Sequence, residues 1–154
     1  MPELAEVQTV VNDLKSLIGV LIKGACGLDK KFLSLETRLT GRRIKGVHRK
    51  GKYIVFSLDL GYLVSHLRMT GSWLLVGDSN QFKKPKHARF LLYLENQQNL
   101  IFVDPRKFGT LDYVEELPNY LPFNKLGPDG LDLYRHYILD DLIQEAKKSS
   151  KPIK

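Results

Sequence analysis

The feature that most constrains the fold is a series of short apolar runs at close intervals in the middle of the chain. They are rich in β-branched and aromatic residues, and turn-forming Gly, Asn and Asp residues separate them. Within one run, Ala88, Phe90, Leu92 and Leu94 alternate as residues on one face of a strand do. Such closely spaced strands predict an antiparallel sandwich or barrel. The predicted strands are 43–48, 52–58, 62–67, 72–76, 88–94, 99–103 and 110–114.

Helical periodicity precedes these strands. From Pro2 to Ile18 apolar residues recur three and four apart, and Gly19 is a suitable stop. The segment 20–26 is a candidate further strand, and 33–39 is a candidate helical turn or short helix.

A second helical pattern follows the strands. After a loop rich in Pro and Gly, apolar spacing predicts a helix from about Leu139 to Ala146. The chain is therefore predicted to be α+β and mostly β. An N-terminal helix and an antiparallel two-layer β-sandwich form a domain over 1–130, and 131–154 begin a helical second domain.

Charge and cysteine content narrow the function. Lys and Arg outnumber Asp and Glu by 24 to 17, a net charge of +7, which favours a polyanionic partner. Cys26 is the only cysteine, which excludes a disulfide framework and a cysteine-based zinc site. Neither a membrane-spanning run nor a signal peptide is present, so we expect a cytoplasmic protein without a membrane partner.

The first turn of the predicted helix holds a proline and two acids. Pro2 suits a first helical position, and Glu3 and Glu6 complement the helix dipole, which is a sufficient structural explanation. A chemical interpretation also exists. If Met1 is removed, Pro2 presents a secondary amine that is partly neutral at pH 7 and can act as a nucleophile. A carboxylic acid beside it can act as a general acid.

Several segments together resemble a known enzyme family. The chain resembles the N-terminal half of formamidopyrimidine-DNA glycosylases and their endonuclease VIII-like relatives, in order and over its whole length. The segments are Met1-Pro2-Glu3-Leu4-Ala5-Glu6-Val7, Arg49-Lys50-Gly51-Lys52-Tyr53, Ser65-His66-Leu67-Arg68-Met69-Thr70-Gly71-Ser72, Asp104-Pro105-Arg106-Lys107-Phe108-Gly109 and Leu126-Gly127-Pro128-Asp129-Gly130.

The resemblance implies base-excision repair of DNA. A bifunctional enzyme of this type removes oxidised purines (8-oxoguanine and formamidopyrimidine) and cleaves abasic sites by β,δ-elimination through a Schiff base on Pro2. Oxidised pyrimidines fit the endonuclease VIII-like branch. Glu3 would be the general acid, Glu6 would support the site, and Lys52 would be the active-site lysine that holds phosphates near the lesion. Without the family, Lys52 is as readily the solvated tip of a hairpin.

The resemblance also implies residues that fill the gap left by an extruded base. Met69, Arg106 and Phe108 match the family's void-filling residues, and Lys107 is expected to meet phosphate. The alternative for Met69 and Phe108 is a place in the sandwich core.

Two histidines complete the predicted DNA contacts. His87 matches a histidine near the DNA backbone, and His66 is expected to hydrogen-bond a phosphate. The alternative for His66 is a structural histidine in a strand. No histidine pair has metal-ligand spacing, so no metal is expected.

Length is the main departure from the family. Full-length relatives continue into a helix-two-turn-helix domain and a finger that often holds one zinc, whereas this chain is expected to hold no cofactor. We expect a bacterial, nucleoid-associated monomer that acts on double-stranded DNA with a damaged base or an abasic site. Alone it would be weak or inactive, which leaves a damaged-DNA-binding module as the alternative. An unrelated basic β protein that binds RNA is a third hypothesis.

Overall fold

The computed structural model describes residues 3–77 and 84–117. The element order confirms an N-terminal helix followed by strands. The elements are α1 (Leu4–Leu14), η1 (Lys15–Leu17), β1 (Ile22–Gly27), η2 (Lys30–Phe32), α2 (Leu35–Leu39), β2 (Ile44–Lys50), β3 (Tyr53–Leu58), β4 (Tyr62–His66), β5 (Ser72–Val76), β6 (Ala88–Leu94), β7 (Asn99–Val103) and β8 (Thr110–Val114).

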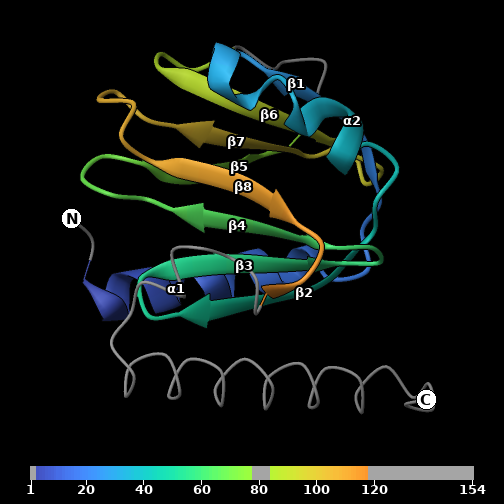
Figure 1. The fold of residues 1–154 in the computed structure, drawn as a ribbon, viewed down its shortest axis with the longest axis horizontal. Coiled ribbons are helices and arrows are strands. Elements are labelled where there is room, and N and C mark those ends of the chain that lie inside the picture. Colours follow the sequence, from blue (N-terminus) through green and yellow to red (C-terminus); the bar gives the residue numbers. More distant parts are fainter. Residues whose placement is uncertain (1–2, 78–83, 118–154) are drawn as a thin grey trace.

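Two four-stranded antiparallel sheets form the domain (Figure 1). The first has the order β1-β6-β7-β5 and the second β2-β3-β4-β8. The predicted two-layer sandwich is therefore confirmed. The chain passes from the second sheet to the first between β4 and β5, and returns between β7 and β8.

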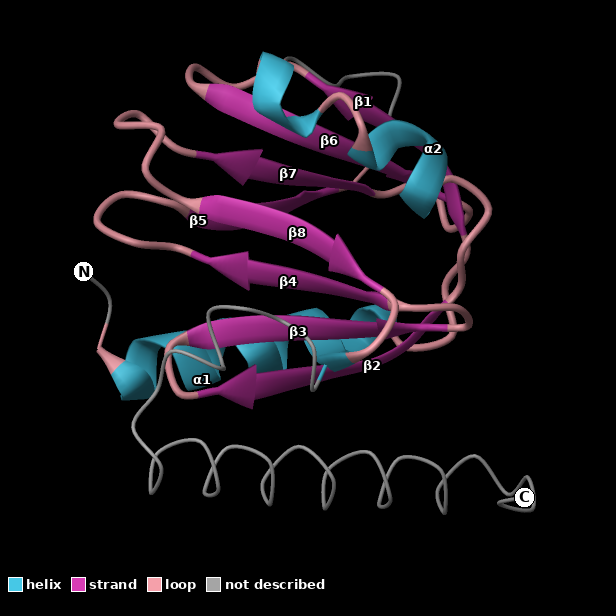
Figure 2. Cartoon of the chain, in the orientation of Figure 1, coloured by secondary structure: helices cyan, strands magenta, loops and turns pink. Residues whose placement is uncertain are grey.

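The two α-helices pack mainly on different sheets. In Figure 2, α1 lies along β2 and β3 and α2 lies beside β1. Val7, Val11 and Leu14 on one face of α1 are buried, as helical spacing predicts. The helix begins at Leu4, two residues later than predicted, with Glu3 in extended conformation as its N-cap. Pro2 lies outside the described residues.

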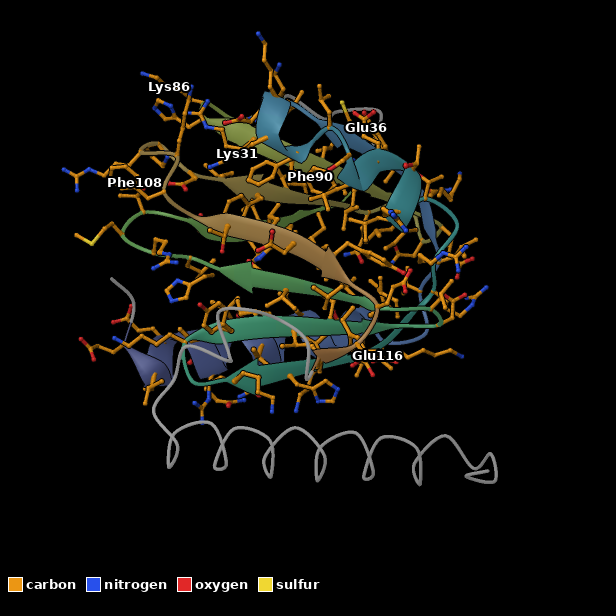
Figure 3. The ribbon with its side chains drawn as sticks, viewed as in Figure 1. Lys31, Glu36, Lys86, Phe90, Phe108 and Glu116 are labelled. Atoms are coloured by element: carbon orange, nitrogen blue, oxygen red, sulfur yellow. The ribbon has the colours of Figure 1, made fainter. Side chains whose placement is uncertain are left out.

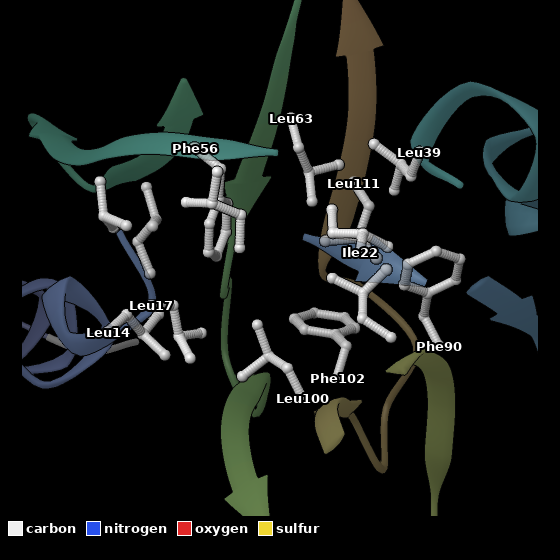
Figure 4. Close-up of a cluster of buried hydrophobic side chains, with 14 of the residues drawn as sticks. Leu14, Leu17, Ile22, Leu39, Phe56, Leu63, Phe90, Leu100, Phe102 and Leu111 are labelled. Atoms are coloured by element: carbon white, nitrogen blue, oxygen red, sulfur yellow. The ribbon is translucent and has the colours of Figure 1, made fainter. Parts of the chain in front are cut away.

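The main core draws on both sheets and on α1 and α2. Figure 4 shows Leu14 and Leu17 from the N-terminal helical segment facing side chains of the strands. Phe90 and Phe102 of the first sheet are fully buried here, as is Phe56 of the second. Phe32 packs edge-on to both Phe90 and Phe102, with ring centroids 6.2 Å apart in each case. Burial on this scale is the main source of the fold's stability.

One expectation about strand faces was wrong. Phe90, Leu92 and Leu94 point into the main core, but Ala88 belongs to a separate cluster with Leu91. The pairing of β6 with β7 shifts register between Ala88 and Phe90. A β-bulge at this point inserts a residue and turns Ala88 to the other face.

The second domain predicted at 131–154, and the motif at 126–130, lie outside the described residues. Within the described part of the chain, no helix is long and apolar enough to cross a membrane.

Candidate nucleic-acid interface

Loops and termini carrying the predicted site residues gather at one end of the sandwich, on the left in Figure 1. This end holds the start of α1, the β2–β3 turn, the β4–β5 loop, the start of β6 and the β7–β8 loop. In Figure 3 the labelled side chains of Lys86 and Phe108 both lie there. Antiparallel pairing brings these segments together because alternate strand ends meet at the same edge.

The start of α1 presents two carboxylates to solvent. Glu3 and Glu6 are both exposed, Glu3 as the N-cap and Glu6 in the first turn. A hydrogen bond fixes this helix to the β2–β3 hairpin, since Arg49 Nε donates to Gln8 Oε1 at 2.9 Å. Arg49 also donates to the carbonyl of Gly51 at the turn, at 3.1 Å. The acids and the hairpin lysine, Lys52, therefore stand on segments held against each other.

Lys52 and His66 lie close enough to influence each other. Burial, followed by the positive charges of Arg68 and Lys52, lowers the pKa of His66 to about 4. The imidazole packs edge-on to Tyr53, with ring centroids 4.6 Å apart. Its Nδ1 accepts a hydrogen bond from the backbone N–H of Arg68 at 2.9 Å.

These contacts fix the state of His66. An acceptor Nδ1 carries no proton, so the neutral ring carries its proton on Nε2. His66 is 7% exposed, which supports the structural alternative for this residue. Nδ1 is engaged by the loop, which leaves Nε2 as the only ring atom for the predicted phosphate contact.

The β4–β5 loop exposes Met69. Its side chain is 50% exposed, so the core alternative for Met69 is wrong. Arg68 before it adopts a left-handed conformation, with φ of 54°. Gly71 closes the loop: its N–H donates to the carbonyl of Leu67 at 2.8 Å, and an added Cβ would lie 2.6 Å from that oxygen. Only glycine fits this approach.

The β7–β8 loop exposes Phe108 in the same way. Phe108 is 60% exposed, the largest exposed fraction among the large apolar residues of the described chain. A buried position for Phe108 is therefore also wrong. Arg106 and Lys107 on this loop are exposed as well, and Lys107 has a left-handed φ of 63°. An exposed aromatic ring beside two cations is typical of a surface that binds nucleic acid.

His87 lies beside the base of this loop. It is exposed, with a left-handed φ of 65°, and its carbonyl accepts a hydrogen bond from the N–H of Asp104 at 3.0 Å. The preceding Lys84 and Lys86 are exposed too. The predicted phosphate-contact residues of this segment thus reach solvent at the same end as Phe108.

Asp104 and Thr70 are important to this arrangement, and the sequence did not indicate a role for either. Asp104 is only 1% exposed, and its carboxylate accepts from Thr70 Oγ1 at 2.5 Å and from the N–H of Gly109 at 2.7 Å. An Asp at the start of a turn is a known signal for side-chain bonding to the backbone two or more residues on. Its bond to Thr70 spans 34 residues and depends on the strand pairing, so no local pattern indicates it.

Two further basic side chains support the β7–β8 loop. Arg89 Nε donates to the carbonyl of Asp104 at 2.9 Å. Lys31 Nζ donates to the carbonyls of Lys107 and Gly109, at 2.6 and 3.3 Å. Free carbonyls of a turn are thereby satisfied from neighbouring elements, which stabilises the loop.

One open depression of the described surface lies away from these residues. A cavity of about 430 Å³ lies between α2 and β8, and none of the predicted site residues lines it. Its lining residues are Lys31, Ser34, Leu35, Arg38, Leu111, Asp112, Tyr113 and Glu115. The exposed members of the predicted site, among them Met69 and Phe108, lie instead on loops at the end of the sandwich described above.

No group of three His, Cys, Asp or Glu residues within 3–77 and 84–117 is arranged to hold a metal ion. A cysteine-held zinc finds no ligand set there, since Cys26 is the chain's one thiol.

Exposed apolar side chains and cations on loops at one end of a two-sheet sandwich define a candidate nucleic-acid-binding domain. Residues 1–111 match the family description "Formamidopyrimidine-DNA glycosylase N-terminal domain". The Formamidopyrimidine-DNA glycosylase of Mycoplasma genitalium is 34% identical over 162 residues, which cover 100% of this chain and 56% of that protein. The enzyme of the same name from Streptococcus pyogenes is 34% identical, over 99% of this chain and 58% of that protein.

Solved structures agree. The complex of Lactococcus lactis Fpg with DNA containing an abasic site matches with a TM-score of 0.72 at 32% identity, over 79% of this chain and 48% of that chain. The complex of the same protein with DNA containing FAPY-dG gives a TM-score of 0.71 at 33% identity, over 79% and 48%. The chain belongs to the formamidopyrimidine-DNA glycosylase family. It spans little more than half the length of the curated relatives it matches.

Proposed function

We propose that the protein acts in DNA base-excision repair, as a glycosylase and abasic-site lyase whose nucleophile is the amine of Pro2. The observation that carries the proposal is the gathering of four features at one end of the sandwich. The start of α1 with Glu3, the Lys52 hairpin and the loops exposing Met69 and Phe108 all face one side. Structures of Lactococcus lactis Fpg with damaged DNA match this fold.

The first proposed step is attack on a damaged nucleotide. After loss of Met1, the neutral secondary amine of Pro2 attacks C1′, and the bond from C1′ to the base breaks. Glu3, at the N-cap next to Pro2, donates a proton to the departing base or the sugar ring oxygen. Opening of the sugar ring then gives an iminium between C1′ and the Pro2 nitrogen. Glu6 lies one turn further and supports this site.

The second proposed step is strand cleavage. The iminium withdraws electrons from C1′, so the C2′ proton becomes acidic and is removed. The electron pair moves to form a C2′–C3′ double bond, and the 3′ phosphate leaves. A second elimination releases the 5′ phosphate, and water then hydrolyses the iminium and frees Pro2. Lys52 on the adjacent hairpin is proposed to hold a phosphate that flanks the lesion.

The loops would stabilise the opened duplex. Met69 and Phe108 are exposed apolar side chains of the kind that insert between base steps. Arg106 has the donors to pair with the base left without a partner, while Lys107, His66 and His87 are proposed to face the phosphates. Oxidised purines, 8-oxoguanine and formamidopyrimidine, are the proposed damaged bases.

Borohydride trapping on abasic-site DNA tests the proposal. Borohydride reduces the iminium to a stable amine, so the chain with a free Pro2 should become covalently attached to the DNA. A matched form with one extra residue before Pro2 converts the amine to an amide and should give no adduct. Folding of the two forms can be compared by circular dichroism.

Each result has a clear meaning. An adduct that requires the free amine supports the enzyme. Equal trapping of the extended form would contradict Pro2 as the nucleophile, and binding without any adduct would support a damaged-DNA-binding module. Excision of a damaged base by the 154 residues should be weaker than trapping, because trapping needs only an amine and an aldehyde.

A further inference from the structure

We propose that Thr70 and Asp104 form a clip that sets the position of Met69 relative to Phe108. Both are positioning residues, and the consequence for lesion recognition rests on the function proposed above. The clip joins the β4–β5 and β7–β8 loops, both of which connect the two sheets. It is internal to the protein, so it can be measured without DNA.

Three hydrogen bonds make up the clip. Thr70 Oγ1 donates to Asp104 Oδ1 at 2.5 Å and accepts from the N–H of Arg106 at 3.2 Å. Asp104 Oδ2 accepts from the N–H of Gly109 at 2.7 Å. One hydroxyl and one carboxylate thus hold both ends of the β7–β8 loop and the residue that follows Met69.

Packing brings the two loops to the same point of the core. An added Cβ on Gly71 would lie 3.0 Å from Phe102 Cζ, and one on Gly109 would lie 2.6 Å from the same atom. The final glycine of each loop therefore sits against the tip of one buried ring. The loops share this anchor but point their apolar side chains, Met69 and Phe108, into solvent.

Burial makes the clip strong. Asp104 is 1% exposed, so its carboxylate relies on these donors in place of water. Loss of the Thr70 hydroxyl removes one donor from the buried acid and one acceptor from Arg106. The β4–β5 loop would then keep its anchor at Gly71 and lose its link to the β7–β8 loop.

Paired spin labels on the 154-residue chain measure the effect. Cys26 is replaced by Ser, and Met69 and Phe108 are each replaced by Cys and labelled with a nitroxide. The distance distribution is recorded in three backgrounds: Thr70, Thr70→Val and Thr70→Ser. Valine keeps the shape of threonine without the hydroxyl, and serine keeps the hydroxyl. We expect a narrow distribution for Thr70, a broader one for Thr70→Val and a narrow one for Thr70→Ser.

A binding arm uses the unlabelled chain and two duplexes, one continuous and one with a tetrahydrofuran abasic-site analogue. Thr70→Val should lower the preference for the analogue roughly fivefold, the size of one hydrogen bond, while binding to the continuous duplex stays unchanged. Thr70→Ser should restore the preference. A variant that is merely less stable would lose affinity for both duplexes, and thermal melting identifies that case.

The arms separate the clip from the proposed function. An unchanged distance distribution in Thr70→Val, or broadening in Thr70→Ser equal to that in Thr70→Val, overturns the clip. A broadened distribution with an unchanged preference overturns its role in recognition. If the unsubstituted chain itself shows no preference for the analogue, the proposed function fails, while the spin-label distances still decide whether the clip exists.

Discussion

At the scale of single residues, His66 is the clearest case of a side chain whose state is set by the fold. Its ring is buried beside Tyr53, and its Nδ1 is occupied by the N–H of Arg68. Its place three residues before Met69, a predicted void-filling residue, was visible in the sequence, but its burial was not. Burial comes from strands β3 and β4 pairing so that Tyr53 lies opposite His66.

His66 should titrate far below an ordinary histidine. Burial and the charges of Arg68 and Lys52 lower its pKa from 6.5 to about 4. The folded state therefore binds fewer protons than the unfolded state between these values, and stability is lost as the pH falls from about 6.5 towards 4. NMR of the ring protons should give a midpoint near pH 4, and Arg68→Met should raise it because one positive charge is removed.

Lys52→Met serves as the weaker companion variant, since Lys52 contributes less to the pKa shift of His66 than Arg68 does. A midpoint near 6.5 in the unsubstituted chain would show that His66 is solvated and that neither burial nor the charges of Arg68 and Lys52 lower its pKa.

Substitution of Phe108 should weaken DNA binding and leave the stability of the fold nearly unchanged. Its side chain is 60% exposed, so Phe108→Ala should change the free energy of unfolding by roughly 0.5 kcal/mol or less. Stacking of an aromatic ring on a base contributes roughly 1–3 kcal/mol, so the affinity for a duplex with an abasic-site analogue should fall about tenfold or more. Fluorescence anisotropy measures this loss.

Leu60 offers the matched control. It is 59% exposed on the turn between β3 and β4, at the other end of the sandwich. Leu60→Ala should leave binding unchanged, and an equal loss in both variants would mean that Phe108 has no specific contact with DNA.

At the scale of elements, strands were the most predictable part of the fold. Alternation and turn residues placed all seven runs between 43 and 114 within a few residues of β2 to β8. The candidate strand at 20–26 is β1, and the candidate short helix at 33–39 contains α2. The pairing of β1 with β6 and of β5 with β7 joins distant segments, and neighbours in sequence carry no information about it. The Thr70–Asp104 contact was unpredictable for the same reason.

Gly109 should be intolerant of any side chain. It is buried at the end of the β7–β8 loop, where a Cβ would lie 2.6 Å from Phe102 Cζ and 2.8 Å from Asp104 Oδ2. Overpacking of this kind costs about 1–3 kcal/mol, so Gly109→Ala should lower the melting temperature by several degrees. Scanning calorimetry provides the measurement.

Gly77 is a suitable control for Gly109. A Cβ there has no atom within 4 Å, and Gly77 does not need a positive φ. Gly77→Ala should melt close to the unsubstituted chain, and equal melting of Gly109→Ala would contradict the close packing of the loop.

At the scale of the whole molecule, the two sheets meet around Trp73, the only tryptophan. Its ring lies 5.1 Å from that of Phe102 in the first sheet and 5.4 Å from that of Phe56 in the second. Its Nε1 donates to Ser65 Oγ at 3.0 Å, also in the second sheet. Tryptophan fluorescence therefore reports on contact between the sheets.

The sandwich should unfold as one cooperative unit. Denaturation followed by Trp73 fluorescence should coincide with denaturation followed by far-UV circular dichroism, because the core is shared. Phe102→Ala should reduce the free energy of unfolding by about 3–5 kcal/mol. Tyr93, 43% exposed on the first sheet, provides the control Tyr93→Ala with a much smaller effect. Two separate transitions would show that the sheets are independent.

The central proposal, that the N-terminal proline is the nucleophile, is tested most directly by locating the DNA attachment. After borohydride trapping on abasic-site DNA, the protein is digested with a protease and the DNA with a nuclease, and the modified peptide is sequenced by mass spectrometry. We predict a reduced sugar remnant on the nitrogen of Pro2, with Met1 removed. A remnant on Lys52 or another lysine, with Pro2 unmodified, would contradict the proposal.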